Sequence, residues 1–194
     1  SLDEARNQAQ MLGVEYHTIS IEPAFKTFTE SLQETLRGDT AGVTEQNIQA
    51  RCRGVLLMAI SNKSGKLLLT TGNKSELAVG YATLYGDMAG GFAPIRDCTK
   101  SMVYALCRYR NGLSRAIPEA VIARVPSAEL APDQKDSDNL PPYDVLDPIL
   151  TAFVEEDLSV ADIVARGFDA ATVKRVVKLV QQAEYKRRQA PPGV

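Results

Sequence analysis

The chain has 194 residues, of which 44% are hydrophobic and 24% are charged, and its formal net charge is -2. This length and composition are typical of one globular domain with a sizeable core, and a charge so close to zero provides no basic field for nucleic acid or an anionic membrane. No apolar run reaches the roughly 18 residues of a spanning helix, so we expect a cytoplasmic protein without nucleic-acid or membrane partners.

The first segments predict a helix followed by a strand. Residues 2–13 place their apolar side chains on one stripe, and Gly13 is expected to end that helix. Residues 14–21, "VEYHTISI", alternate and are rich in β-branched side chains, which predicts a strand. A helix followed at once by a strand is typical of a doubly wound α/β sheet, which normally opens with a strand. We therefore expect that a first strand is missing upstream.

The next segments predict two helices separated by a loop. The first helix is expected over residues 24–37, the loop over 37–44, and the second helix over 45–61, with Thr44 as its cap. In the second helix, Gly54 would let another backbone or a ligand come close. The stripe expected to face the core contains Ile48, Cys52, Val55, Leu56 and Ala59, and the adjacent stripe contains Asn47, Arg51, Gly54 and Met58.

The segment "LLLTTGNKSELAVG" places charged and polar residues where a strand ends. Residues 67–71 are a continuous apolar run, as in a buried parallel strand, and a helix is expected over 75–84. Ligands of open α/β sheets lie beyond the carboxyl ends of the strands, where helix amides attract phosphate. Glu76 could therefore hold Mg²⁺ beside phosphate. Equally, Ser75 could cap the helix and Glu76 could offset its dipole.

The second half of the chain predicts more helix around one long connection. A helix is expected over residues 99–113, followed by a proline-rich polar connection over 117–144. Connections of that length are usually functional lids or disordered, and we expect residues 127–144 to form a lid-like loop. The remaining helices are expected over 143–157, 159–168 and 169–189, with Pro148 near the start of the first.

Cysteine and histidine usage argues against several kinds of site. Cys52, Cys98 and Cys107 are widely spaced and form no CxxC pair, and His17 is the only histidine. We therefore expect neither a structural zinc site nor a disulfide framework. His17 lies inside a strand-like run, which disfavours Ser-His or Cys-His nucleophilic catalysis. The cysteines are expected to be buried as small apolar side chains in a reducing cytosol.

Three motifs together resemble the synthetase domain of glutamine-dependent NAD synthetase, over nearly the whole chain. They are "LLLTTGNKSELAVGYATLYGDMAGGFAPIRDCTK", "VPSAELAPDQKDSDNLPPYDVLD" and "EYKRRQAPPGV". This family belongs to the ATP pyrophosphatases. The resemblance implies an α/β fold, with a doubly wound and mostly parallel sheet like that of the adenine nucleotide alpha hydrolases, and a helical C-terminal part. It also implies ATP-dependent amidation of deamido-NAD to NAD through an adenylated intermediate.

The resemblance implies a role for each of several residues. Lys100 and Ser127 would be catalytic and would contact ATP together with Thr71, and Glu76 would be a magnesium ligand near deamido-NAD. The residues implied for deamido-NAD itself are Asn47, Arg51, Glu76, Asp87 and Lys186. Each has a plain alternative: Arg51 and Lys100 could be solvated, and Lys186 could offset a helix dipole. The joint pattern favours the site.

Three departures from the family pattern leave other readings open. The Ser-Gly-Gly-x-Asp-Ser phosphate loop and the ammonia-producing glutaminase domain are absent from this sequence, so we expect this chain alone not to make NAD. Gly91 stands where ammonia-using relatives often have aspartate. The alternatives are another ATP pyrophosphatase that amidates or thiolates a different acid, and a catalytically incomplete module that binds nucleotide or oligomerises. By resemblance alone, a homo-oligomer is expected.

Overall fold

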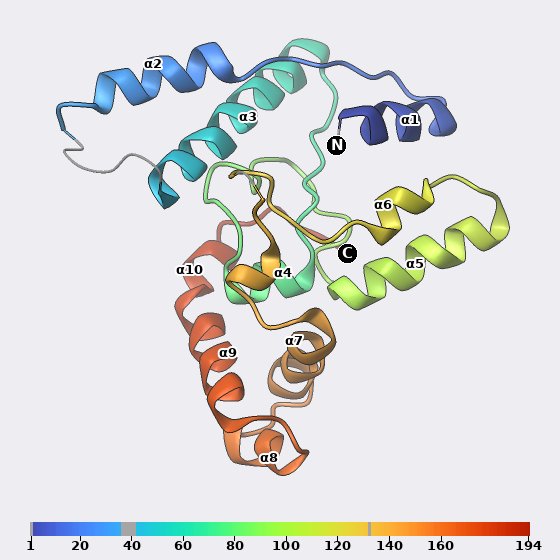
Figure 1. Ribbon diagram of the computed structural model, residues 1–194, viewed down its shortest axis with the longest axis vertical. Coiled ribbons are helices and arrows are strands. Elements are labelled where there is room, and N and C mark those ends of the chain that lie inside the picture. Colours follow the sequence, from blue (N-terminus) through green and yellow to red (C-terminus); the bar gives the residue numbers. More distant parts are fainter. Residues whose placement is uncertain (1, 36–41, 132) are drawn as a thin grey trace.

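The computed structural model describes residues 2–35, 42–131 and 133–194, which are mostly helical (Figure 1). A single 3₁₀ turn at Asp136–Asp138 and a π-helical turn at Thr151–Glu155 accompany the α-helices. The helices are α1 Leu2–Leu12, α2 Glu22–Leu32, α3 Val43–Ser64, α4 Lys74–Val79, α5 Lys100–Leu113, α6 Glu119–Ala123, α7 Tyr143–Leu150, α8 Val160–Ala165, α9 Ala170–Gln182 and α10 Glu184–Arg187. None of these helices combines the length and apolar character needed to cross a membrane.

The hydrophobic core lies among α4, α7, α8 and α9. In Figure 1, α4 sits centrally, and it packs against α7 and α9, while α8 packs against α9. Helix α9 contributes buried valines at spacings of three and four residues, which lie on one face of a helix. The most deeply buried core side chains are Leu146, Ile149, Leu150, Ile163, Val173 and Val176. The helical C-terminal part expected from the sequence is thus present and forms the core together with α4.

The expected sheet is not formed by the described residues. Residues 14–21 are irregular, so the strand predicted there is wrong, and residues 67–71 make only one parallel bridge, Leu69 with Phe92. A second isolated parallel bridge joins Ala93 to Gly193 in the C-terminal tail. A strand needs a neighbour whose backbone groups complete its ladder, and β-propensity alone does not provide one. Among the described residues, parallel pairing is thus limited to these two isolated bridges.

Helix α3 differs from its prediction at both ends and on one face. It begins at Val43, not after Thr44, because the Glu45 carboxylate accepts the Gly42 amide at 2.9 Å and so satisfies the cap. It continues to Ser64 and ends at Gly65, which has a left-handed φ of 69°. Val55 is 64% exposed and Ala59 is also exposed, so the stripe predicted to face the core is wrong in its second half.

Gly54 behaves as the sequence predicts. A Cβ atom at Gly54 would lie 3.0 Å from the Gly86 carbonyl oxygen, so the glycine allows the 85–86 backbone to lie directly against α3. The loop expected over 37–44, and the last part of the helix expected over 24–37, fall partly on residues outside those described.

The C-terminal helices are shorter than predicted. The helix expected over 143–157 becomes α7 and the π-helical turn, and Asp157 then takes a positive φ of 54°. The helix expected over 159–168 is only Val160–Ala165, because Gly167 leaves the helix at a φ of 99°. The helix expected over 169–189 is divided at Ala183 into α9 and α10. The helix expected over 99–113 is confirmed as α5, with Thr99 as its cap.

Candidate functional site

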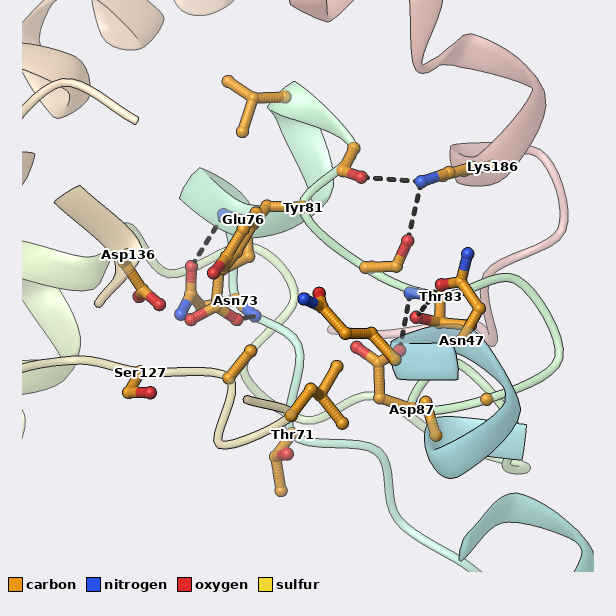
Figure 2. Close-up of a pocket in the computed structure, with 18 of the residues that line it drawn as sticks. Asn47, Thr71, Asn73, Glu76, Tyr81, Thr83, Asp87, Ser127, Asp136 and Lys186 are labelled. Carbon is orange, nitrogen blue, oxygen red and sulfur yellow. Dashed lines mark hydrogen bonds between the residues drawn. The ribbon is translucent and has the colours of Figure 1, made fainter. Parts of the chain in front are cut away.

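A cavity of about 900 Å³ lies between α3, α4 and α5, the loop that follows α4, and the segment 127–140. Seven of the eight residues predicted for the site line this cavity: Asn47, Thr71, Glu76, Asp87, Lys100, Ser127 and Lys186. Figure 2 shows these side chains, except Lys100, labelled around it. The eighth, Arg51, is not part of the wall, and its Nε donates to the Leu84 carbonyl at 3.2 Å. The sequence thus identified one wall of residues that the fold brings together.

An ion pair between α4 and α5 lies on the cavity wall. Lys100 Nζ donates to Glu76 Oε1 at 2.8 Å, and the two side chains are only 19% and 18% exposed. Burial disfavours the Lys100 ammonium, but the charge and hydrogen bond of Glu76 outweigh it, so the pKa of Lys100 lies above its ordinary value. Lys100 is therefore a held cation, not a solvated surface lysine.

Asn73, not Ser75, caps the helix that carries Glu76. The Asn73 side chain accepts the Glu76 amide at 3.0 Å, and Glu76 Oε2 accepts the Asn73 amide at 3.3 Å, which is a capping box. Ser75 lies inside the first turn and is fully buried. The Glu76 carboxylate thus completes the helix start and binds Lys100 at the same time. Glu76 lies in the first turn, where its charge can offset the helix dipole as one of its two expected roles requires, but the expected serine cap is wrong.

A second polar group, which the sequence did not single out, lies near Lys100. The Tyr143 hydroxyl donates to Asp136 Oδ2 at 2.7 Å, and the Lys100 ammonium lies 5.4 Å from the centre of the Tyr143 ring. Asp136 is 4% exposed, and its Oδ1 and the Tyr81 hydroxyl are buried polar atoms without hydrogen-bond partners in the described structure. Burial, followed by the negative charge of Asp136, raises the pKa of Tyr81 to about 12.

These residues could have been noticed only through the quoted motif "KDSDNLPPYD", which contains Asp136 and Tyr143. Their burial and mutual contact come from the way the segment 126–143 folds. The Asp136 amide donates to the Pro126 carbonyl at 3.0 Å and so closes this segment into a loop. The lid-like loop predicted over 127–144 therefore contains a 3₁₀ turn and anchored acidic and aromatic side chains.

On the other side of the cavity, Thr83 links Asn47 to Asp87 through two hydrogen bonds. The Thr83 hydroxyl donates to Asn47 Oδ1 at 2.8 Å, and the Thr83 amide donates to Asp87 Oδ1 at 2.6 Å. Asp87 keeps surface open to the cavity. The protein atoms that crowd its carboxylate still desolvate the charge, which raises the pKa of Asp87 above its ordinary value.

Lys186 is held by backbone carbonyls. Its Nζ donates to the Gly80 and Ala82 oxygens, both at 2.7 Å, as the dashed lines in Figure 2 show. An ammonium has three donors, so these two bonds leave one for a ligand. Burial lowers the pKa of Lys186, the Asp87 charge opposes that shift, and the Arg51 charge adds to it. Lys186 therefore fixes the loop after α4 as well as facing the cavity.

The residues predicted around ATP lie apart from Lys186. Thr71 ends the 67–71 segment with an exposed side chain, and Ser127 is half-buried, with its Oγ accepting the Glu129 amide at 3.1 Å. In the view of Figure 2, Ser127 and Lys186 lie on opposite sides of the drawn cavity. The predicted nucleotide side and the predicted deamido-NAD side are thus different parts of one cavity.

The donor atoms on the nucleotide side suit a hard cation. Glu76 and Asp136 offer carboxylate oxygens, and Ser127 offers a hydroxyl, which are the oxygen ligands that Mg²⁺ prefers. No cluster of three or more His, Cys, Asp or Glu side chains placed to hold a metal occurs among the described residues. Mg²⁺ commonly uses one or two carboxylates together with substrate phosphates, so the residues present fit that arrangement.

Comparisons with known proteins identify the family of this chain. The NAD synthase family model matches residues 1–190. The glutamine-dependent NAD(+) synthetase of Acinetobacter baylyi is 54% identical over 195 residues, which cover 100% of this chain and 36% of that protein. Among solved structures, the glutamine-dependent NAD+ synthetase of Acinetobacter baumannii in complex with ADP has a TM-score of 0.63 at 48% identity, covering 97% of this chain and 34% of that one.

A more distant match has a different name. The NMN synthetase of Francisella tularensis has a TM-score of 0.78 at 28% identity, covering 96% of this chain and 69% of that one. The chain spans about a third of the length of the glutamine-dependent relatives and corresponds to their synthetase part. Because the family model covers nearly all of these residues, the chain belongs to the NAD synthase family.

Proposed function

We propose that this chain carries the ATP-dependent amidation of deamido-NAD to NAD, as the synthetase part of a glutamine-dependent enzyme. The observation that carries the proposal is that seven predicted residues line one cavity, with a shielded Lys100–Glu76 pair on its wall. Relatives with 48% and 54% identity are named glutamine-dependent NAD(+) synthetases, whereas the NMN synthetase is only 28% identical. Deamido-NAD is therefore favoured over a different acid.

The chemistry explains why a held cation is needed. A carboxylate is a poor electrophile, so an oxygen of the nicotinate carboxylate first attacks the α-phosphorus of ATP and pyrophosphate leaves. Ammonia then attacks the acyl carbon, loses a proton, and AMP leaves with the C–O electron pair. Negative charge accumulates on the departing pyrophosphate in the first step, and a preorganised ammonium such as Lys100 stabilises it. Ser127 and Thr71 would bind phosphate oxygens beside it.

The oxygen donors support a role for magnesium on the same side. Glu76 would hold Mg²⁺, with the Ser127 hydroxyl and the Asp136 carboxylate nearby. When bound, Mg²⁺ supplies Lewis-acid neutralisation of phosphate charge. Glu76 already bonds Lys100 and the Asn73 amide, so its position is set before any ligand arrives.

The opposite side would bind deamido-NAD. Asn47, Asp87 and Lys186 line it, and Arg51 lies close enough for its charge to affect Lys186. Ammonia would come from a glutaminase domain, as the names of the relatives suggest. A homo-oligomer in the cytoplasm is part of the same proposal and follows from the family resemblance alone.

The test uses Glu76→Gln and Lys100→Ala in the full-length protein. Pyrophosphate release from MgATP and deamido-NAD is measured at saturating magnesium. Each variant should lose roughly a hundred-fold or more in kcat/KM for ATP, since each removes a charge used in the transition state. The matched control is Lys26→Ala with Glu30→Gln, an exposed pair on α2 with an N–O distance of 3.8 Å. If the site variants resemble this control, the proposed function is wrong.

A further inference from the structure

The first turn of α5 is held by side chains from three places. The first amides of a helix have no partner within the helix. Thr99, the cap, accepts one of them. The Lys100 amide donates to Ser75 Oγ of α4, and the Ser101 amide donates to Asp147 Oδ2 of α7, both at 2.8 Å. Two of the amides are therefore satisfied by other helices, which is a tertiary arrangement and not an ordinary cap.

Asp147 is also bonded to Ser75. The Ser75 hydroxyl donates to Asp147 Oδ1 at 2.5 Å and accepts the Lys100 amide, so it is used in both directions. Ser75 is fully buried, and Asp147 is 4% exposed. One carboxylate oxygen of Asp147 thus faces α4 and the other faces α5. Figure 1 shows these two helices and α7 meeting at the centre of the molecule.

This geometry fixes Lys100 at both ends. Its backbone nitrogen is held by Ser75, and its ammonium is held by Glu76, the next residue of α4. Asp147 orients the Ser75 hydroxyl and holds the neighbouring Ser101 amide. A displacement of Asp147 would therefore move the backbone of Lys100, from which its side chain extends, although Asp147 does not line the large cavity.

The burial of a carboxylate also needs a reason. Elsewhere α7 packs through Leu146, Ile149 and Leu150, and an apolar side chain at 147 would avoid the desolvation of a charge. A carboxylate gives what an apolar side chain cannot, which is two directed acceptors facing two helices. The desolvation cost of the Asp147 carboxylate is thus offset by a fixed position of α4 relative to α5.

We propose that Asp147 is a positioning residue for the Lys100–Glu76 pair and acts through Ser75 and the first turn of α5. The inference rests on the proposed function only in that ATP is the ligand used to detect it. A purely structural aspartate would affect folding stability alone. A positioning aspartate affects ATP through Lys100, and its effect disappears when Lys100 is removed.

The test is a double-mutant cycle of Asp147→Asn and Lys100→Ala in the full-length protein. The Kd for MgATP is measured by calorimetry, which does not require a catalytically active variant. Asp147→Asn keeps the side-chain volume but replaces one acceptor by a donor, and it should weaken MgATP binding about ten-fold. In the Lys100→Ala background, the same change should weaken binding less than about two-fold. The KM for deamido-NAD should change less than about three-fold in Asp147→Asn.

The control is Asp169→Ala. Asp169 caps α9 by accepting the Thr172 amide at 2.8 Å and is exposed, so the loss of this cap should lower the melting temperature without changing the Kd for MgATP. If Asp147→Asn does not fold, Ser75→Ala replaces it in the cycle with the same expected pattern, since it removes only the hydroxyl that joins Asp147 to Lys100.

The outcomes separate the two claims. Equal weakening of MgATP by Asp147→Asn with and without Lys100 overturns the positioning role, and so does an effect on melting temperature alone. If Lys100→Ala itself leaves the Kd for MgATP unchanged, the proposed function fails and this inference falls with it. Weaker MgATP binding in Asp147→Asn that disappears in the Lys100→Ala background, which is energetic coupling of the two residues, supports both claims.

Discussion

The cavity has two walls that are built in different ways. The wall made by α4 and α5, against which α7 packs, rests on buried side chains, with Asn73 at 2% exposure and Ser75 at 0%. The wall made by α3 and the segment 127–135 rests on longer bonds between partly or fully exposed groups. Those bonds join Gln49 to the Leu130 carbonyl at 3.2 Å, Arg53 to the Glu129 carbonyl at 3.3 Å and Gln134 to Gln46 at 3.4 Å.

The difference predicts which wall is fixed before ligands bind. A buried hydrogen bond is costly to break because its groups lose their partner without gaining water, whereas an exposed bond exchanges with solvent at little cost. The Lys100–Glu76 pair lies on the fixed wall, where preorganisation assists charge stabilisation. The segment 127–135 lies on the wall that can adjust, which suits a lid over a bound nucleotide.

The first and largest contrast compares the same substitution in two places. Val176→Ala removes two methyl groups from the fully buried core and should lower the free energy of unfolding by about 2 kcal/mol. Val55→Ala on α3, where the side chain is 64% exposed, should cost less than about 0.5 kcal/mol. Urea denaturation measures both. Equal losses would mean that the α3 face is covered in the protein tested.

A smaller contrast concerns the hydrogen bonds of the two walls. Asn73→Ala removes the cap of α4 and should cost about 1 kcal/mol of unfolding free energy, together with part of the MgATP affinity. Gln49→Ala on the other wall should cost less than about 0.5 kcal/mol. Thermal melts compare the two variants. A Gln49→Ala loss as large as that of Asn73→Ala would contradict the distinction between the walls.

The smallest expected effect is the pH dependence of folding stability that is due to Asp87. Its pKa is raised in the fold, so the folded state binds this proton more tightly than the unfolded chain. The stability it contributes is present below the unfolded pKa of about 3.9 and is lost as the pH rises through the folded pKa. Asp87→Asn keeps an acceptor for the Thr83 amide. It should therefore remove the dependence of the melting temperature on pH that the titration of Asp87 causes. Melting temperatures across that range, with Asp97→Asn as an exposed control, check it.

The site was predicted better than the elements around it. Glu76 was identified from its place after an apolar run, Thr71 and Lys100 were identified through the family resemblance, and all three line the cavity. Ser75 was the expected cap, but Asn73 caps the helix, and residue type alone could not have distinguished them because both residue types cap helices well. A shift of two residues in the start of α4 turned the expected cap into a buried hydrogen-bonding group.

Tertiary packing determined what the sequence could not predict. Residues 14–21 have strand-like alternation, but no described segment pairs with them. Asp136 and Tyr81 are polar residues whose burial follows only from the folding of distant segments onto α4 and α7. The second half of α3 is apolar, yet it is exposed in this structure, because periodicity indicates which residues share a face and not what covers it.

Amide hydrogen exchange tests the central claim most directly. In the full-length protein, the amides of Lys100 and Ser101 are held by buried Ser75 and Asp147, whereas those of Glu129 and Leu130 are held by the Ser127 and Gln134 side chains. Without ligand, the α5 amides should be protected at least roughly a hundred-fold more strongly, and MgATP should add protection mainly at Glu129 and Leu130. Equal protection of both sets in the free protein would contradict the account of a fixed and an adjustable wall.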